Sequence, residues 1–173
     1  NKINFQFNVE ETEKLYVNKI NIFGNNITSE EFIRDNLYVD EGDPFNKILH
    51  NKSINNLKSK GIFKTVKSNI VDTKNINQKN IDLIVEERPT GEISAGAGYG
   101  TEGSSFSLGV RENNFNGKGI ELDAEIHLTE ESLKGSISYT HPNFAYSDRA
   151  LTTALESTST DKLNGSGYKT SLN

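Results

Sequence analysis

The sequence contains neither Cys nor Met among its 173 residues, and it has no long apolar run. Without Cys, a disulfide framework and a Cys-based metal site are both excluded. Because no Met starts the chain and no signal-peptide pattern opens it, we expect a processed or excised piece of a longer protein. No apolar run approaches the ~20 residues that a membrane-spanning helix needs, so a helical membrane protein is excluded. A membrane barrel is not excluded, since its strands carry only a weak alternating pattern.

Positive charge is also scarce relative to negative charge. The chain has 19 Lys and Arg against 24 Asp and Glu, which gives a formal net charge of −5. A nucleic-acid surface is normally strongly basic. The charge balance therefore argues against nucleic acid as a partner.

The composition changes near Pro89. Before this residue, long aliphatic side chains are mixed with Lys, Asn and Glu, and after it come Gly, Ser and Thr with apolar residues at every second position. We place the domain boundary at residues 87–91 and expect one domain over residues 14–89 and another over 90–173. Residues 168–173 still have the pattern of a strand, so we expect the second domain to continue beyond this piece.

The first domain has the pattern of a strand, two helices and two strands. Its strands are predicted at residues 15–23, 63–71 and 80–87, from alternating apolar residues bounded by turn residues. We expect an α+β domain with two helices packed on one face of a three-stranded sheet. The shared core is predicted to contain Phe32, Ile33, Leu37, Ile54, Leu57, Ile81, Leu83 and Val85.

The two helices carry start and stop signals. Thr28 and Glu31 match a capping box at the start of the first helix. Pro44 is predicted to open the second helix, where its missing N–H costs nothing, and Gly61 to end it. The apolar side of the second helix is predicted to consist of Phe45, Ile48, Leu49, Ile54 and Leu57.

A partial repeat precedes this domain. Residues 5–11 align with residues 81–87, with apolar residues at every second position and two acidic residues at the end of each. We interpret residues 1–13 as the end of a preceding copy of the same module. The alternative is that any two strands ending in acidic residues look alike.

The second domain is a run of strands at short spacing. The predicted strands are residues 92–100, 104–111, 119–128, 133–141, 150–158 and 166–173. Their connections are short, polar and rich in Gly, which predicts an antiparallel meander. One strand face is apolar or small, and the charges within the strands fall on the other: Glu92, Arg111, Glu121, Asp123, Glu125, His127, Lys134, Glu156 and Lys169.

This alternation fits either a soluble sheet with one buried face or a membrane barrel. The apolar face is rich in Ala, Gly and Thr, which are poor material for a close-packed core. A charge near the middle of a bilayer costs ~2–4 kcal/mol, which would explain why that face carries none. We therefore favour the barrel, which strands outside this piece must close. The link at residues 88–91 is too short to cross a bilayer, so we expect residues 114–118 and 142–148 on the side of the first domain, and residues 101–103 and 129–132 on the far side.

We expect no enzyme, no cofactor and no metal. His50, His127 and His141 are scattered and show no ligand spacing. The acidic residues at 121, 123 and 125 share one strand face and could bind a cation, but a hydrated lumen wall is the favoured interpretation. The glycines between residues 96 and 100 are not followed by a helix, so they do not form a phosphate-binding loop.

Several short motifs occur together in one order. Those of the first domain resemble a POTRA domain: residues 16–20, 23–25, 41–43, 57 and 61–63, with an exit at 85–91. Those of the second resemble the first barrel strand and first two periplasmic turns of the BamA family: residues 96–102, 113–119 and 142–144. The chain is thus similar, over nearly its whole length, to the last POTRA domain and opening barrel strands of that family.

This resemblance implies assembly and insertion of β-barrel proteins into the outer membrane of a Gram-negative bacterium, without nucleotide or covalent chemistry. It implies a periplasmic POTRA domain that guides unfolded outer-membrane β-barrel proteins and contacts partner lipoproteins, beside outer-membrane lipid. It also implies a lateral gate, in which the first barrel strand pairs loosely with the last and a substrate strand adds at its edge. The gate residues would be Glu92, Ile93, Ser94, Ala95, Gly96, Ala97, Gly98, Tyr99 and Gly100. The periplasmic turns would comprise Asn114, Phe115, Asn116 and Gly117, and then Pro142, Asn143 and Phe144.

The glycines of the predicted gate strand have two possible meanings. Gly96, Gly98 and Gly100 share its inner face, while Ala95 and Ala97 lie at the centre of its outer face. Small residues weaken a strand and remove cross-strand pairs, as a seam designed to open requires. The alternative is that the glycines only let the barrel curve. Other functions also remain open: a TamA-like factor or two-partner secretion transporter, a passive porin, and a soluble β-rich interaction or adhesin domain.

Overall fold

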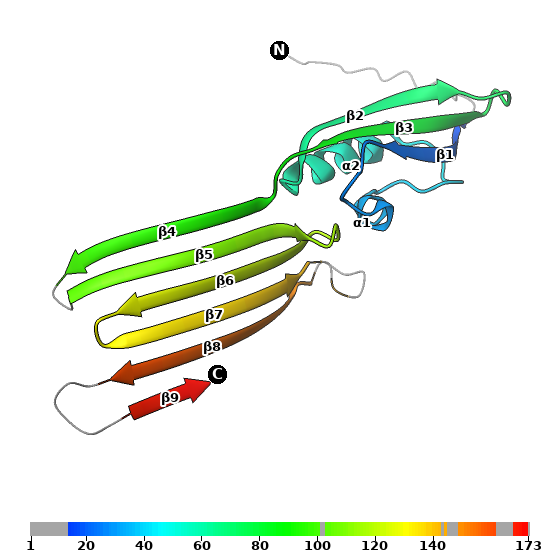
Figure 1. Ribbon diagram of the computed structural model, residues 1–173. Coiled ribbons are helices and arrows are strands. Elements are labelled where there is room, and N and C mark those ends of the chain that lie inside the picture. The colour runs from blue at the N-terminus through cyan, green and yellow to red at the C-terminus, as the bar shows by residue number, and fades with distance from the viewer. Residues whose placement is uncertain (1–13, 101–102, 143, 145–148, 162–167, 173) are drawn as a thin grey trace, which may run out of the picture.

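The computed structural model describes residues 14–100, 103–142, 144, 149–161 and 168–172, as two sheets that follow each other along the chain (Figure 1). The first sheet has three strands and carries two helices. The second has six strands and no helix packed on it (Figure 1). None of the helices in the described part of the chain is both long and apolar enough to span a membrane.

The first sheet has the strand order β1-β3-β2. Its strands are β1 (Tyr16–Phe23), β2 (Phe63–Asp72) and β3 (Gln78–Glu87), and its helices are α1 (Glu30–Asp35) and α2 (Lys47–Ser59). β1 runs parallel to β3, and β2 antiparallel to it. A register shift between Val17 and Lys19 interrupts the alternation of β1, so that Val17 and Ile20 are both buried. The predicted arrangement of two helices and three strands is confirmed.

The predicted core is confirmed as two adjoining clusters of buried side chains. The larger contains Phe32, Ile33, Leu57, Ile62, Phe63, Val66, Leu83 and Val85, with Leu37 and Ile54 packed against it. The smaller contains Val17, Ile20, Val39 and Ile81. The residues that the prediction missed come mainly from β1 and from the start of β2.

The predictions of where the two helices begin are both wrong. α1 is capped by Ser29, whose side chain accepts from the N–H of Phe32, rather than by Thr28. α2 begins at Lys47 after the cap Asn46, and Pro44 instead forms a β-bridge with Tyr16. The Asn46 side chain accepts the N–H groups of the first turn, which sets the helix start there.

The apolar side of α2 also differs from the prediction. The predicted Leu57 is buried and Ile54 packs against the core, but Ile48 is 78% exposed, and the helix also buries His50 and Ser53. Its buried residues are thus His50, Ser53 and Leu57. These three residues lie at spacings of three and four, as one helical face requires. The predicted helix end is confirmed, because Gly61 follows the C-cap Lys60 with a φ of +71°.

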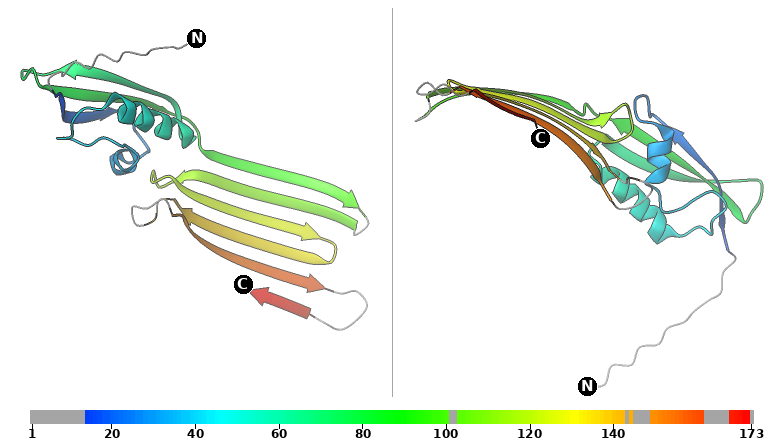
Figure 2. Two further views of the ribbon diagram at one scale, coloured as in Figure 1. Left: turned by 180° about the vertical axis from the view of Figure 1, so that it is seen from behind. Right: turned by 90° about the horizontal axis from the view of Figure 1, so that it is seen from below.

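The second sheet is an antiparallel meander in the order β4-β5-β6-β7-β8-β9. Its strands are β4 (Gly91–Gly100), β5 (Gly103–Phe115), β6 (Ile120–Thr129), β7 (Ser132–His141), β8 (Leu151–Asp161) and β9 (Tyr168–Leu172). The sheet is curved (Figure 2). All six predicted strands are present, with ends shifted by a few residues, and β5 runs on to Phe115.

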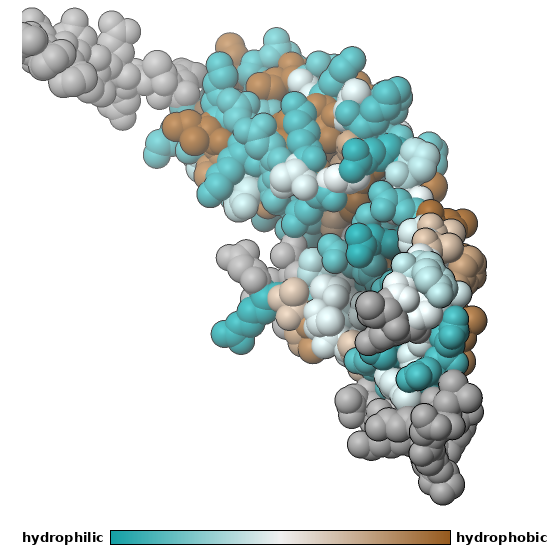
Figure 3. Space-filling model, turned by 90° about the vertical axis from the view of Figure 1, so that its left-hand side faces the viewer, coloured by the Kyte–Doolittle hydropathy of each residue, from teal (hydrophilic) through white to brown (hydrophobic). Residues whose placement is uncertain are grey.

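The strand register gathers the apolar residues on one face. Val110 of β5 faces Ala124 of β6, which faces Ile137 of β7, which in turn faces Leu155 of β8. In the space-filling view, brown side chains run along the right-hand edge of this sheet (Figure 3). Most large side chains of the apolar face remain about half exposed, including Leu108 at 45% and Ile126 at 54%. The register therefore does create an apolar face, and nothing in the described chain covers it.

Candidate functional site

The predicted gate residues, from Glu92 to Gly100, all lie on β4. Within the described residues β4 pairs with β5 alone, in an uninterrupted register that sets Ser94 opposite Gly109 and Gly98 opposite Ser105. Every residue of β4 is exposed. The backbone N–H and C=O groups on its other edge have no neighbouring strand in this part of the chain, and such an edge is a template for pairing with another strand.

On the inner face of β4 and β5, each of three cross-strand pairs combines a serine with a glycine. A Cβ at Gly96 would lie 2.7 Å from the Oγ of Ser107, and a Cβ at Gly109 would lie 2.6 Å from the Oγ of Ser94. At Gly98 the distance to the Oγ of Ser105 would be 3.0 Å. The glycines make room for the facing hydroxyls, and a shift by two residues would set Gly96 against Gly109 in one direction or Ser94 against Ser107 in the other. These pairs favour one register on the β5 side, which the sequence interpretation did not foresee.

The polar face of the sheet forms a hollow next to these pairs. Glu92, Ser94, Arg111, Asp123, Glu125, Ser136 and Ser138 are among its lining residues. Arg111 forms an ion pair with Asp123, with 2.5 Å between Nε and Oδ1. In the described part of the chain, no group of three His, Asp or Glu side chains is arranged to hold a metal ion.

The first predicted periplasmic turn ends β5 and contacts the helical domain. Asn114 and Phe115 are the last residues of β5, and the turn is made by Asn116 and Gly117, with φ of +56° and +70°. The buried Asn114 donates its Nδ2 to the Oγ1 of Thr28 at 3.0 Å, and the backbone N–H of Ser29 donates to the C=O of Gly117 at 2.9 Å. Thr28, predicted as a helix cap, is therefore part of an interdomain contact.

Glu87 holds the loop that receives this turn. Its carboxylate accepts the backbone N–H of Asn26 at 3.0 Å, of Ile27 at 3.1 Å and of Thr28 at 2.6 Å. Burial raises the pKa of Glu87, but the hydrogen bonds from the Thr28 side chain and from these backbone N–H groups outweigh it, so the pKa lies below its ordinary value. The end of β3 thus fixes the loop between β1 and α1.

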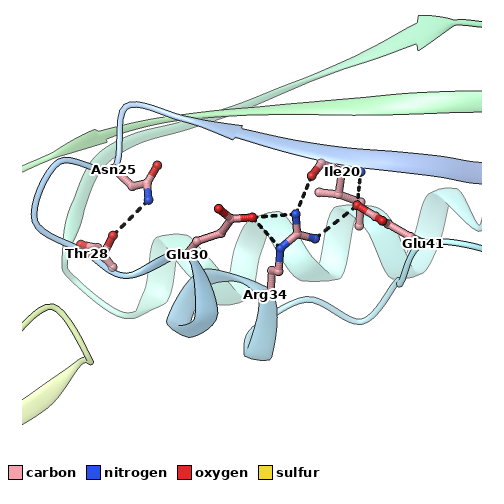
Figure 4. A network of polar contacts seen from close by, with 6 residues as sticks. All are labelled: Ile20, Asn25, Thr28, Glu30, Arg34 and Glu41. Atoms are coloured by element: carbon pink, nitrogen blue, oxygen red, sulfur yellow. Dashed lines mark hydrogen bonds and ion pairs between the residues drawn. The ribbon is translucent and has the colours of Figure 1, made fainter.

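Arg34 ties the short helix α1 to the sheet (Figure 4). Its guanidinium donates to Glu30 at 2.8 Å and to the C=O of Ile20 at 2.9 Å, and it lies 3.4 Å from Glu41. Glu41 in turn accepts the backbone N–H of Ile20 at 2.9 Å. In the same loop, Asn25 donates to the C=O of Thr28 at 3.1 Å (Figure 4). Arg34 thus holds α1 against β1, and Asn25 braces the loop between β1 and α1.

The second predicted turn is described only in part. Asn143 lies outside the described residues. Phe144 donates its N–H to the C=O of Arg149 at 2.8 Å, and its ring meets the ring of His141 edge-on at 6.0 Å. The C=O of Pro142 lies 2.9 Å from Nδ1 of His141. β7 ends at the same end of the sheet as β5 (Figure 1).

Comparison with known proteins gives the class of the fold. Residues 15–88 match the POTRA family, described as a surface antigen variable number repeat. The crystal structure of BamA from Haemophilus ducreyi lacking POTRA domains 1–3 is similar, with a TM-score of 0.78 at 28% identity over 90% of this chain and 30% of that one. CdiB from Acinetobacter baumannii has a TM-score of 0.58 at 17% identity, over 89% of this chain and 30% of that one, which shows the fold alone.

Curated relatives extend the likeness to the sequence. The outer membrane protein assembly factor BamA of Neisseria meningitidis is 30% identical over 144 residues, which are 82% of this chain and 18% of the relative. That of Buchnera aphidicola is 30% identical over 151 residues, 86% of this chain and 24% of the relative. The chain therefore spans about a fifth of the length of these relatives.

These findings define a POTRA domain followed directly by antiparallel strands that match a BamA barrel. The chain belongs to the BamA family of outer membrane protein assembly factors.

Proposed function

We propose that this chain is part of an outer-membrane factor that inserts β-barrel proteins, and that β4 is its lateral gate. The observation that carries the proposal is that β4, within the described residues, pairs with β5 along one edge only, in a sheet whose apolar face no described residue covers. Hydrocarbon cannot satisfy the N–H and C=O groups of the other edge, so a strand must pair there. That strand would be the barrel's own last strand when the gate is closed and a client strand when the gate opens. Backbone hydrogen bonds would hold a client strand whatever its sequence.

The division of the chain follows from this role. Residues 14–89 would form a periplasmic POTRA domain that guides unfolded outer-membrane proteins and docks partner lipoproteins. Residues 90–173 would form the first six strands of the barrel in the outer membrane, and residues 1–13 the end of a preceding POTRA repeat. The proposed work is noncovalent, since strand addition uses only hydrogen bonds and burial.

The alternation of β4 to β8 supports a membrane location for the sheet. The apolar face carries no charge at its centre, while the ion pair between Arg111 and Asp123 lies on the other face. A lipid-facing surface and a hydrated lumen would require this division. A sheet of a soluble protein would cover the apolar face instead.

Crosslinking tests the gate. In the full-length protein, a Cys at Ser94 or Ala97 is expected to form disulfides with Cys residues along the terminal strand of a client barrel, at several registers two residues apart. Ala124 of β6 supplies the matched control, because β6 is paired on both sides. Crosslinks at Ala124 as frequent as at Ala97 would show that clients do not pair specifically with β4.

A lock on the same strand gives the complementary test. A disulfide between β4 and the last strand of the barrel should stop client insertion, and a reducing agent should restore it. Full assembly activity in the locked and oxidised protein would contradict the gate. The inner-face glycines would then serve only to curve the sheet and seat the serines.

Labelling of intact cells tests the orientation. A bulky impermeant label should reach a Cys at Glu131, between β6 and β7, and not a Cys at Lys118, beside the POTRA domain. Both residues are exposed, whereas the neighbouring Gly117 is unsuitable because it has a positive φ and abuts Ile27. Labelling of Lys118 alone would reverse the proposed topology.

A further inference from the structure

The contact between the POTRA domain and the first barrel turn joins residues far apart in the sequence. The turn that follows Asn114 lies against the loop that contains Thr28 and Ser29 (Figure 1). Thr28 and Asn114 are 2% and 5% exposed, although both side chains are polar. Buried polar groups are costly unless hydrogen-bonded, and here the Asn114 amide bonds to the Thr28 hydroxyl across the domain boundary.

Asn114 also shapes the turn that it belongs to. Its Oδ1 accepts the N–H of Gly119 at 2.8 Å, and its C=O accepts the N–H of Gly117 at 2.9 Å. Its own N–H donates to Glu112 at 2.7 Å. One asparagine therefore folds the turn and presents Nδ2 to the other domain.

The turn fits closely against the POTRA domain because two of its residues are glycines. A Cβ at Gly117 would lie 2.1 Å from the C=O oxygen of Ile27, and one at Gly119 would lie 2.2 Å from the ring of Phe32. Ile120, the next residue, is 4% exposed. The backbone of Gly117 packs against the backbone of Ile27 and that of Gly119 against the Phe32 ring, so no larger side chain fits at either position.

The link between the domains is fastened at both ends. Arg88 donates its backbone N–H to Ile62 at 3.1 Å, inside the POTRA domain. Thr90 accepts the N–H of Asn113 at 3.3 Å and donates its hydroxyl to Glu112 at 2.5 Å, on the barrel side. Rotation of one domain against the other therefore has to occur near Pro89 and has to break the contact between Asn114 and Thr28.

We propose that Asn114, Thr28 and the glycine turn form an interdomain latch that holds the POTRA domain at one fixed angle beneath the first barrel hairpin. Asn114 and Thr28 are positioning residues, since they set where the POTRA domain stands relative to the free edge of β4. The fixed angle is inferred from the contacts alone, whereas the effect of that angle on client delivery rests on the proposed function.

Spin-label distances in the full-length protein in lipid nanodiscs test the fixed angle. Asn55 of α2 and Glu131 are both exposed and lie in different domains, so a Cys at each can carry a label. This chain has no native Cys. The unaltered protein should give one narrow distance distribution. Asn114→Ala and Thr28→Val should broaden it, with about a tenfold fall in the ratio of latched to unlatched molecules.

Two variants serve as matched controls. Thr28→Ser keeps the hydroxyl that accepts from Asn114, and Lys118→Ala truncates an exposed side chain of the same turn. Both should keep the narrow distribution. Unchanged distributions in both Asn114→Ala and Thr28→Val would overturn the latch, and because they lie in different domains, misfolding of one leaves the other decisive.

Client insertion by the same variants tests the positioning role separately. Asn114→Ala and Thr28→Val should slow insertion several-fold, while the two controls should not. Broadened distances with normal insertion would overturn the positioning role and leave the latch as a structural contact. Neither result depends on the β4 lock, so failure of the latch and failure of the gate remain distinguishable.

Discussion

The two sheets of this chain use the same alternation of apolar and polar residues but dispose of the apolar face differently. In the POTRA sheet, α1 and α2 cover that face, and Val17 and Leu83 are each 1% exposed. In the barrel sheet, Leu108 of β5 and Ile126 of β6 face each other on the apolar face, and both are about half exposed. The first sheet finds its cover within the chain, and the second leaves an apolar surface for its surroundings to cover.

This difference shows that alternation of apolar and polar residues predicts an apolar sheet face, but does not predict whether protein or lipid covers it. Apolar surface is removed from water by helices in one case and, in our account, by lipid in the other. The composition of the face separates the two cases. The covered face carries mainly Ile, Leu, Val and Phe, whereas the uncovered one mixes such residues with Ala and Gly.

The largest expected effect tests the covered face. Leu57→Ala should lower the free energy of unfolding of the POTRA domain by ~2–5 kcal/mol, because Leu57 is fully buried between α2 and the sheet. Ile48→Ala, on the same helix but 78% exposed, should change it by less than ~0.5 kcal/mol. Urea titration of the domain measures both. Equal losses would mean that α2 packs through a different face.

The next effect tests the uncovered face. Ile137→Lys should destabilise the membrane-embedded barrel by ~2–4 kcal/mol, while Ser136→Lys, on the next residue of β7, should be tolerated because its side chain enters the polar hollow. Reversible unfolding of the full-length protein in lipid vesicles measures the two. Equal tolerance of both lysines would mean that the apolar face meets water.

The regular parts of both sheets could be predicted from the sequence, because alternation and turn residues are local signals. The cap of α1 could not, since both Thr28 and Ser29 are N-cap residue types and the capping-box pattern, which pairs Thr28 with Glu31, pointed to the wrong one. The contact that occupies Thr28 comes from Asn114, 86 residues away, and leaves no local signal. The serine partners of the β4 glycines required the register, which the spacing alone does not fix.

A smaller effect tests the serine and glycine pairs of β4. Gly96→Ala should destabilise the pairing of β4 with β5 by about 1 kcal/mol, because the Oγ of Ser107 occupies the space of the new methyl group. Adding Ser107→Gly should recover part of the loss. Gly100→Ala, which meets nothing within 4 Å, serves as the control. Hydrogen exchange of the β4 amides measures this loss. Equal exchange rates in Gly96→Ala and Gly100→Ala would contradict the close fit of serine against glycine.

The smallest expected effect is the pH dependence that Glu87 gives to the stability of the POTRA domain. Its folded-state pKa is depressed, so its contribution to POTRA stability is present above the ordinary carboxyl pKa of about 4.5 and is lost as the pH falls below it. Glu87→Gln should therefore lower the unfolding free energy at pH 7 by roughly 0.5–1 kcal/mol and flatten its fall below the ordinary carboxyl pKa. Thermal unfolding at several pH values would speak against this if parent and variant gave parallel curves.

The comparison of the two sheets depends most directly on what the apolar face of the barrel strands touches. Spin labels placed one at a time along β6, from Leu122 to Leu128, can be scanned in the full-length protein in lipid for collision with oxygen, which concentrates in lipid, and with a water-soluble nickel chelate. The account predicts that labels at positions 122, 124, 126 and 128 favour oxygen and that those at 123, 125 and 127 favour nickel, a strict alternation of period two. High nickel accessibility at positions 124 and 126 would contradict it, because the apolar face would then lie in water.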